Sequence, residues 1–198
     1  MTQPCPTTTP LHRRTLVRGA AWTSPMVVVT GTAPAFAASP TPALGGALTF
    51  NRSSTTDSCR ITLGGNGPSV FNSQGFWIAD ATTTTAATRL TMIVYLPSTW
   101  AGATVARGSG GATTWSFLRP LSTITNPPDG MPSSFVAYTT TYSGALTYDA
   151  TNKALLSLER PFFTLTRAGA CASTLTMYVR RTALVDGQTQ TVDRNRVL

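Results

Sequence analysis

The stretch RLTMIVYL, residues 89–96, decides the fold class of this 198-residue chain. Its β-branched and aromatic residues favour an extended strand over a helix. Pro97 follows at once and ends the strand, because proline has no N–H to donate to a β-ladder. The stretch therefore predicts a buried strand in a chain built mainly of strands.

Further short runs with strand character follow one another, separated by turn residues that leave little room for helices. They cover residues 47–50, 59–63, 75–79, 113–118, 134–142, 145–148, 162–166 and 174–180. Residues 154–158 fit a strand or a helical turn equally well. Asp186-Gly187 predicts a hairpin, and the alternating charges of 189–197 predict an edge strand. The pattern predicts an all-β domain, an antiparallel β-sandwich with immunoglobulin-like topology.

The N-terminus has the pattern of an export signal. Arg13 and Arg14 stand before an apolar segment, as in twin-arginine leaders, and Ala35, Ala37 and Ala38 form a small-residue cleavage site. The apolar segment is too short and too interrupted for a membrane-spanning helix. We expect an export signal at 1–37, a flexible linker at 38–46 and the sandwich at 47–198. The general secretory route remains an alternative to the twin-arginine route.

Cleavage at this site changes the chemistry available to the chain. It removes His12, the only histidine, together with Cys5, and lowers the net charge from +8 to +5. Charged residues make up 11% of the chain, far below the usual share of about 25%, which is typical of secreted β-proteins. The arginines are scattered, which argues against nucleic acid as a partner. A mild positive charge favours anionic cell-wall polymers by long-range attraction.

Two cysteines remain after cleavage, Cys59 and Cys171. An even number of cysteines in an exported domain indicates a disulfide. Such a bond would tie an early strand to a late one. The alternative is a pair of separate buried thiols.

The loss of the only histidine limits the catalytic mechanisms that the cleaved chain can use. Catalytic triads and histidine-containing metal sites are excluded, so we expect no metal, no cofactor and no catalytic residue. Glycoside hydrolysis remains, because it needs only two carboxylates roughly 5 to 9.5 Å apart. The seven acidic candidates are Asp57, Asp80, Asp129, Asp149, Glu159, Asp186 and Asp193. Several of them stand in turn sequences, where local hydrogen bonding is the simpler explanation.

Three tryptophans are the candidate binding residues: Trp77, Trp100 and Trp115. Exposed tryptophans stack on sugar rings and anchor protein partners. Trp77 and Trp115 lie within strand-like runs, where a place in the core is the simpler explanation. Trp100 follows a proline-serine turn, and its surroundings decide neither way. Sugar binding would require at least two of the three to be exposed on one face.

Two parts of the chain resemble known proteins. The leader, RRTLVRGAAW at 13–22 and APAFAAS at 33–39, resembles leaders of small actinobacterial exported proteins. Residues 96–100 (LPSTW), 115–117 (WSF) and 142–146 (YSGAL) are similar in order to bacterial immunoglobulin-like surface repeats. The resemblance implies a stalk, spacer or adhesive module, and it carries no catalytic residues over.

The sequence as a whole predicts a secreted or cell-wall-associated module with a structural or adhesive role and no enzymatic activity. Its expected partners are a cell-wall polymer, a glycan or a surface protein. The first alternative is a carbohydrate-binding module that uses exposed tryptophans. The second is a two-carboxylate glycan hydrolase. The sequence leaves the oligomeric state open.

Overall fold

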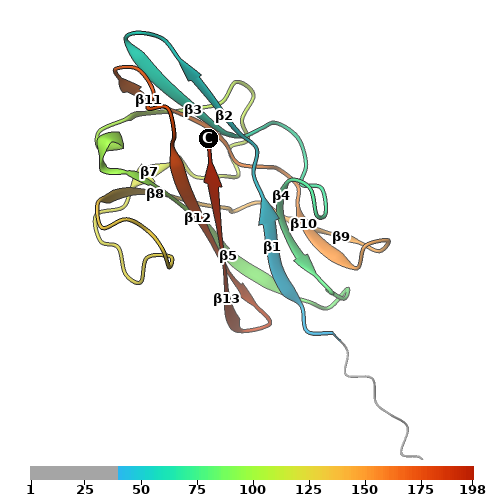
Figure 1. Ribbon diagram of the computed structural model, residues 1–198. Helices are drawn as coiled ribbons and strands as arrows, with labels where there is room; N and C mark the ends of the chain where they lie inside the picture. The colour runs from blue at the N-terminus through green and yellow to red at the C-terminus, as the bar shows by residue number, and fades with distance from the viewer. Residues whose placement is uncertain (1–39) are drawn as a thin grey trace, which may run out of the picture. The chain divides into compact units, whose positions relative to one another are not determined.

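The structure, a computed structural model, describes residues 40–198, which form strands joined by turns and loops (Figure 1). The first strands are β1 (Ala43–Ala47), β2 (Phe50–Ser54), β3 (Ser58–Gly64), β4 (Gly75–Ala79), β5 (Ala87–Pro97), β6 (Thr104–Arg107) and β7 (Arg119–Pro120). The later ones are β8 (Phe135–Thr141), β9 (Leu146–Asp149), β10 (Ala154–Ser157), β11 (Phe162–Ala168), β12 (Thr176–Val185) and β13 (Gln188–Val197). One short 3₁₀ turn, η1 (Ser98–Trp100), follows β5. The expected export signal and cleavage site lie outside the described residues.

The strands pair into three antiparallel sheets. Their orders are β1-β4-β10-β9, β2-β3-β11-β6 and β13-β12-β5-β8-β7. The chain passes directly between the two four-stranded sheets three times, from β1 to β2, from β3 to β4 and from β10 to β11. The all-β antiparallel sandwich predicted from the sequence is confirmed.

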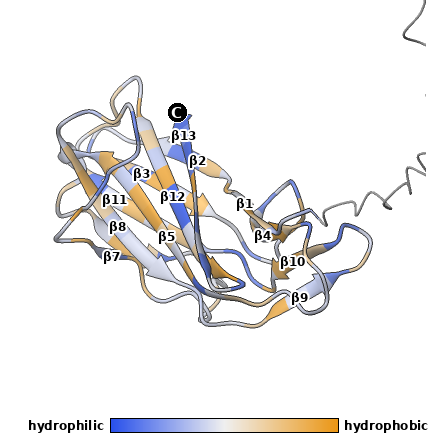
Figure 2. Ribbon diagram, turned by 90° about the horizontal axis from the view of Figure 1, so that it is seen from below, coloured by the Kyte–Doolittle hydropathy of each residue, from blue (hydrophilic) through white to orange (hydrophobic). Residues whose placement is uncertain are grey.

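One apolar core joins the three sheets. It includes Leu63 of β3, Phe163 of β11, Phe76 of β4, Met92 of β5 and Met177 of β12, all fully buried. Apolar residues concentrate on β3, β11 and β5, whereas β13 is largely hydrophilic (Figure 2). The stretch at 89–96 lies within β5, which pairs with β12 on one side and β8 on the other.

The hairpin between β12 and β13 is confirmed, as is the edge position of β13. Val185 pairs with Gln188 across a two-residue turn. Asp186 and Gly187 in this turn both have positive φ, 47° and 79°. Such a turn matches the twist of the two strands, which is why the Asp-Gly dipeptide predicts it.

Two details differ from the expectation, and one alternative that it left open is decided. Residues 113–118 form no strand, and only Trp115 makes an isolated bridge, to Tyr142. Residues 154–158, which fitted a strand or a helical turn, contain the strand β10. β1 begins at Ala43, so residues 43–46 of the expected linker belong to a sheet. The sequence did not predict this strand because it contains Gly45 and Gly46, and glycine has low strand propensity. A Cβ at Gly46 would lie 2.6 Å from Cδ of Arg181, so the close approach of β1 requires glycine there.

A bulge in β5 gives a first stability prediction. The pairing with β12 shifts register between Thr182 and Leu184, and Arg89 in the bulge has φ of 54°. This left-handed conformation costs an L-residue about 1–2 kcal/mol, which glycine avoids. We expect Arg89→Gly to raise the free energy of unfolding by about 0.5–1 kcal/mol, after the entropy cost of glycine is subtracted. Urea unfolding measures the change. Thr88→Gly, one residue earlier, is the control and should destabilise, so a loss in both variants would contradict the assignment.

Candidate functional site

The three candidate tryptophans lie in the core. Trp77, Trp100 and Trp115 are 8%, 1% and 0% exposed. The indole N–H of Trp115 donates a hydrogen bond to the backbone oxygen of Glu159 at 2.9 Å. The 3₁₀ turn η1 turns Trp100 inward, where the guanidinium of Arg167 lies 5.5 Å from its ring centroid.

This burial corrects the prediction of a tryptophan platform. Sugar stacking needs at least two of these rings exposed on one face, and none of the three is exposed. The indoles instead fill the interior of the sandwich, where large aromatic side chains bury much apolar surface. The hypothesis of a carbohydrate-binding module that uses these tryptophans is therefore wrong.

The predicted disulfide is present at one end of the sandwich. Cys59 and Cys171 are bonded, with their Cα atoms 4.7 Å apart. Beside them lies an apolar hollow of about 260 Å³, with Arg52 and Arg167 in its wall. Arg52 donates to the backbone oxygens of Ala172 and Ser173, and Arg167 to those of residues 168 and 170. Both arginines therefore fasten the loop between β11 and β12.

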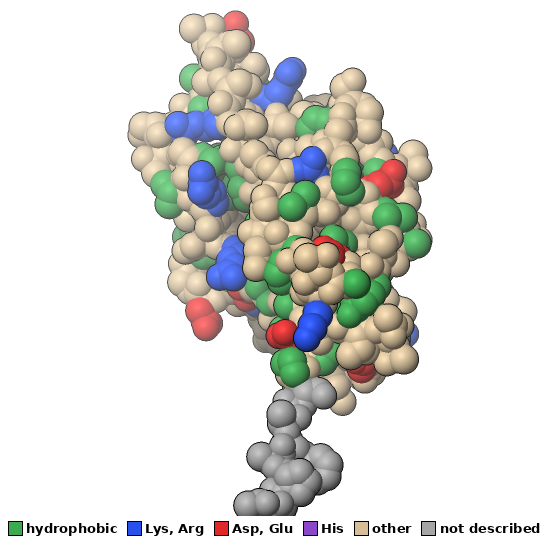
Figure 3. All heavy atoms as spheres, turned by 90° about the vertical axis from the view of Figure 1, so that its right-hand side faces the viewer, with side chains coloured by type: hydrophobic (Ala, Val, Ile, Leu, Met, Phe, Trp, Pro, Cys, Tyr) green, Lys and Arg blue, Asp and Glu red, His purple; other side chains and the backbone are tan. Residues whose placement is uncertain are grey.

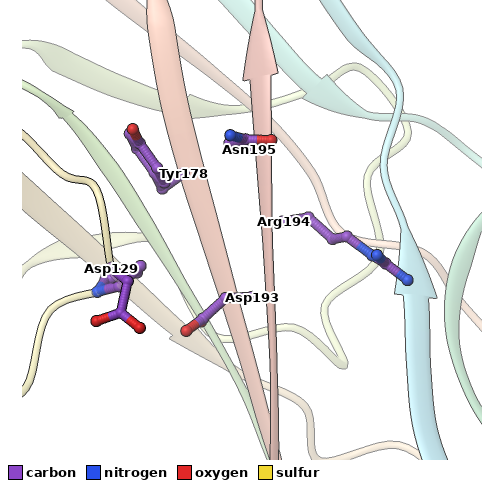
Figure 4. A pocket seen from close by; sticks show the side chains of 6 residues that line it. Asp129, Tyr178, Asp193, Arg194 and Asn195 are labelled. Carbon is purple, nitrogen blue, oxygen red and sulfur yellow. The ribbon is translucent and has the colours of Figure 1, made fainter.

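Two of the seven carboxylates line one surface hollow of about 300 Å³, together with Pro128, Tyr178, Arg194 and Asn195 (Figure 4). These are Asp129, in the loop before β8, and Asp193, on the outer face of β13. Both carboxylate oxygens of Asp193 accept hydrogen bonds from Arg180, at 2.9 and 2.7 Å. The ion pair leaves Asp129 as the one carboxylate of this hollow without a cationic partner among the described residues.

Three other acidic side chains are engaged in local structure. Asp149 accepts hydrogen bonds from the residues of its own turn, and the bond from Asn152 lowers its pKa. Asp186 accepts from the backbone N–H of Ala86, and Glu159 accepts from Thr114. A glycosidase needs one carboxyl group held protonated as the acid. The lowered pKa of Asp149 opposes that role.

A second cleft lies on the opposite side of β13, between this strand and the β1–β2 segment. We call it the arginine cleft. It has a volume of about 170 Å³ and is lined by Gly46, Ala47, Leu48, Phe50, Val179, Arg181, Arg194, Asn195 and Arg196. Figure 4 shows Arg194 pointing away from Asp193 and toward β1. Basic side chains form a column along the left of the face drawn in Figure 3.

Strand register places three arginines on this face. Arg181 lies opposite Val192, Val179 opposite Arg194, and Met177 opposite Arg196. Directly paired residues in an antiparallel sheet point to the same face. Arg194 and Arg196 therefore lie on the same side of the sheet as Arg181, and both are exposed at the edge.

Gln190 fixes the wall of the cleft. Its Oε1 accepts a hydrogen bond from the N–H of Leu44 at 2.6 Å, and its Nε2 donates to the oxygen of Pro42 at 2.7 Å. These bonds join β13 to the segment that leads into β1. We expect Gln190→Ala to lower the free energy of unfolding by roughly 1–2 kcal/mol, at about 1 kcal/mol per net hydrogen bond lost. Chemical denaturation measures it beside Gln188→Ala, an exposed control; equal effects of the two substitutions would contradict this role.

Arg181 occupies an unusual position for a charged residue. It is 1% exposed, on the face of β12 that otherwise carries Met177, Val179, Ala183 and Val185. Its guanidinium lies 5.6 Å from the ring centroid of Phe76, which provides cation–π stabilisation. Burial lowers the pKa of Arg181 to about 10, and the charge of Arg194 contributes to the shift. The guanidinium therefore remains protonated at pH 7.

The sequence contained a signal for this site that the strand assignment missed. The expected strand ended at Arg180, whereas β12 continues to Val185. Extending the alternation from Met177 through Val179 places Arg181, and not Arg180, on the buried face. The exposed arginines of β13 were recognised only as features of an edge strand.

The described residues offer neither a metal site nor a membrane-spanning helix. Residues 40–198 contain no group of three or more metal-ligating side chains. No helix in that range has the length and apolarity that crossing a bilayer requires. Comparison with protein-family models, curated proteins and solved structures found no match. The function is therefore inferred from the residues of the chain itself.

Proposed function

We propose that the chain is an exported, non-catalytic β-sandwich module with a structural or adhesive role, secreted or retained at the cell wall. Its partner in this proposal is an anionic surface polymer. The observation that carries the proposal is the arginine cleft, which three arginines line with no carboxylate in ion-pair distance among the described residues. Uncompensated positive charge of this kind attracts polyanions.

The disulfide supports the location. Disulfides persist in oxidising compartments and are rare in the cytosol. The Cys59–Cys171 bond joins residues 112 positions apart, so it closes most of the sandwich into one loop. A module that bears load or binds a partner outside the cell gains from such a covalent closure, because it limits unfolding.

Fractionation of cells and intact mass together test the proposal. We expect the chain in the culture supernatant or the cell wall, beginning at Ala38 and two hydrogens lighter than its reduced form. A variant with Arg13→Lys and Arg14→Lys should accumulate inside the cell if the twin-arginine route is used. Full-length, reduced wild-type protein confined to the cytoplasm would overturn the proposal.

A further inference from the structure

The guanidinium of Arg181 has N–H groups from which no described residue accepts a hydrogen bond. These groups are at Nε and Nη1, and both atoms are buried. A buried cation without hydrogen-bond acceptors is costly, and proteins rarely retain one without compensation. Its contacts with Phe76 and with the backbone of β1 at Gly46 supply no hydrogen-bond acceptor of the kind that a guanidinium needs.

The described residues that line the cleft around Arg181 add positive charge and include no carboxylate side chain. Arg194 lies close enough to lower the pKa of Arg181, and Arg196 follows on the same face of β13. The one ion pair among residues 40–198, between Arg180 and Asp193, lies on the other face of the sheet. Three like charges around one cleft repel each other unless an anion joins them.

We infer that the arginine cleft is a binding site for a phosphate group, in which the buried Arg181 is the anchor and Arg194 and Arg196 close around the anion. This inference rests on the proposed function and specifies its ligand chemistry. Guanidinium groups bind phosphate oxygens through paired N–H donors. A cleft of about 170 Å³ accommodates one such group with part of its neighbouring chain.

The apolar rim of the cleft suits a phosphate that is part of a polymer. Leu48, Phe50 and Val179 line the same cleft as the arginines. Leu48 and Phe50 are half-buried whereas Val179 is buried, so the first two are the apolar groups that can contact the carbon atoms next to a phosphodiester. β13 is an exposed edge strand, so the cleft opens to solvent beside it. A free phosphate ion would use the same arginines without the apolar contacts.

Isothermal titration of the full-length, disulfide-bonded chain with two probes tests the inference. The probes are inorganic phosphate and a short poly(glycerol phosphate). We expect both to bind, with the polymer tighter per phosphate. Equal affinity per phosphate would assign the site to the free ion. Binding of neither probe would overturn the inference, and it would leave the proposed location of the protein intact.

Neighbouring residues supply the matched variants. Arg181→Met removes the anchor at similar volume, and we expect at least a tenfold loss of affinity for both probes. Arg180→Met removes the same charge from the opposite face of the same strand and should change affinity less than threefold. Equal losses in the two variants would indicate general charge attraction and contradict a defined site.

Two more variants keep the test independent of the folding of Arg181→Met. Arg181→Lys keeps the charge but loses the planar guanidinium, so we expect intermediate binding. Arg194→Gln changes an exposed side chain and should weaken binding at least threefold without affecting the fold. Wild-type affinity in both variants would overturn the assignment of these arginines to the site.

Discussion

Replacing Cys59 and Cys171 by alanine is expected to lower the free energy of unfolding by roughly 4–5 kcal/mol, the largest stability loss predicted here. The bond spans 112 residues, so its removal frees most of the domain in the unfolded state. The entropy that the unfolded chain regains when the bond is removed rises with the logarithm of the number of residues in the closed loop, which accounts for this magnitude. Many domains have total stabilities only slightly larger than this loss.

Equilibrium unfolding in guanidinium chloride measures how much the disulfide contributes to the free energy of unfolding. Cys5→Ser is the matched control, because it removes a cysteine that the bond does not use, and it should match wild type. Reduction of the wild-type chain should reproduce the alanine variant. A loss below about 1 kcal/mol would show that the unfolded chain is little constrained by the bond, contrary to the loop-closure account.

Arg181→Met is expected to act in the opposite direction and to raise the free energy of unfolding by roughly 1–3 kcal/mol in buffer without phosphate. Replacing a buried ion pair by apolar side chains of similar volume is often neutral or stabilising, and a buried charge without a carboxylate partner has the desolvation cost without the gain from pairing. The gain is expected because the Nε and Nη1 atoms of Arg181 have no acceptor in the described chain. The same substitution should weaken anion binding at least tenfold, so stability and function separate at this position.

Arg180→Met provides the control for stability as well. The pair that Arg180 forms with Asp193 is partly exposed, with side chains 16% and 36% accessible. Pairs of this kind contribute about 0–1 kcal/mol, so the variant should be slightly less stable than wild type. Denaturation of both variants under identical conditions measures the contrast. A loss of stability in Arg181→Met as large as that of an ordinary core substitution would contradict the assignment.

Much of the fold was predictable because local signals agreed with the tertiary structure. The apolar run at 89–96 became the core of β5, and Asp186-Gly187 formed the hairpin that its backbone preferences favour. The pairing of Cys59 with Cys171 followed from their even number once Cys5 was assigned to the leader. These predictions depend on short-range chemistry or on simple counting.

The parts that were missed depend on contacts between distant segments. Residues 113–118 have strand-like composition, yet Trp115 is held by the backbone of Glu159 and no continuous ladder forms. Trp100 is buried because η1 turns it beneath Arg167, far along the chain. The arginine cleft brings β1 against β12 and β13, and no local pattern records that approach. Tertiary packing therefore decided which aromatic and charged residues remained available for binding.

The most direct test of the arginine cleft is the melting temperature of wild type and Arg181→Met, each measured by calorimetry with and without phosphate. A ligand that binds only the folded state raises the melting temperature. We expect the variant to melt higher than wild type without phosphate, and phosphate to raise the melting temperature of wild type alone. A variant that melts lower than wild type without phosphate, and that phosphate stabilises as much as wild type, would contradict the account.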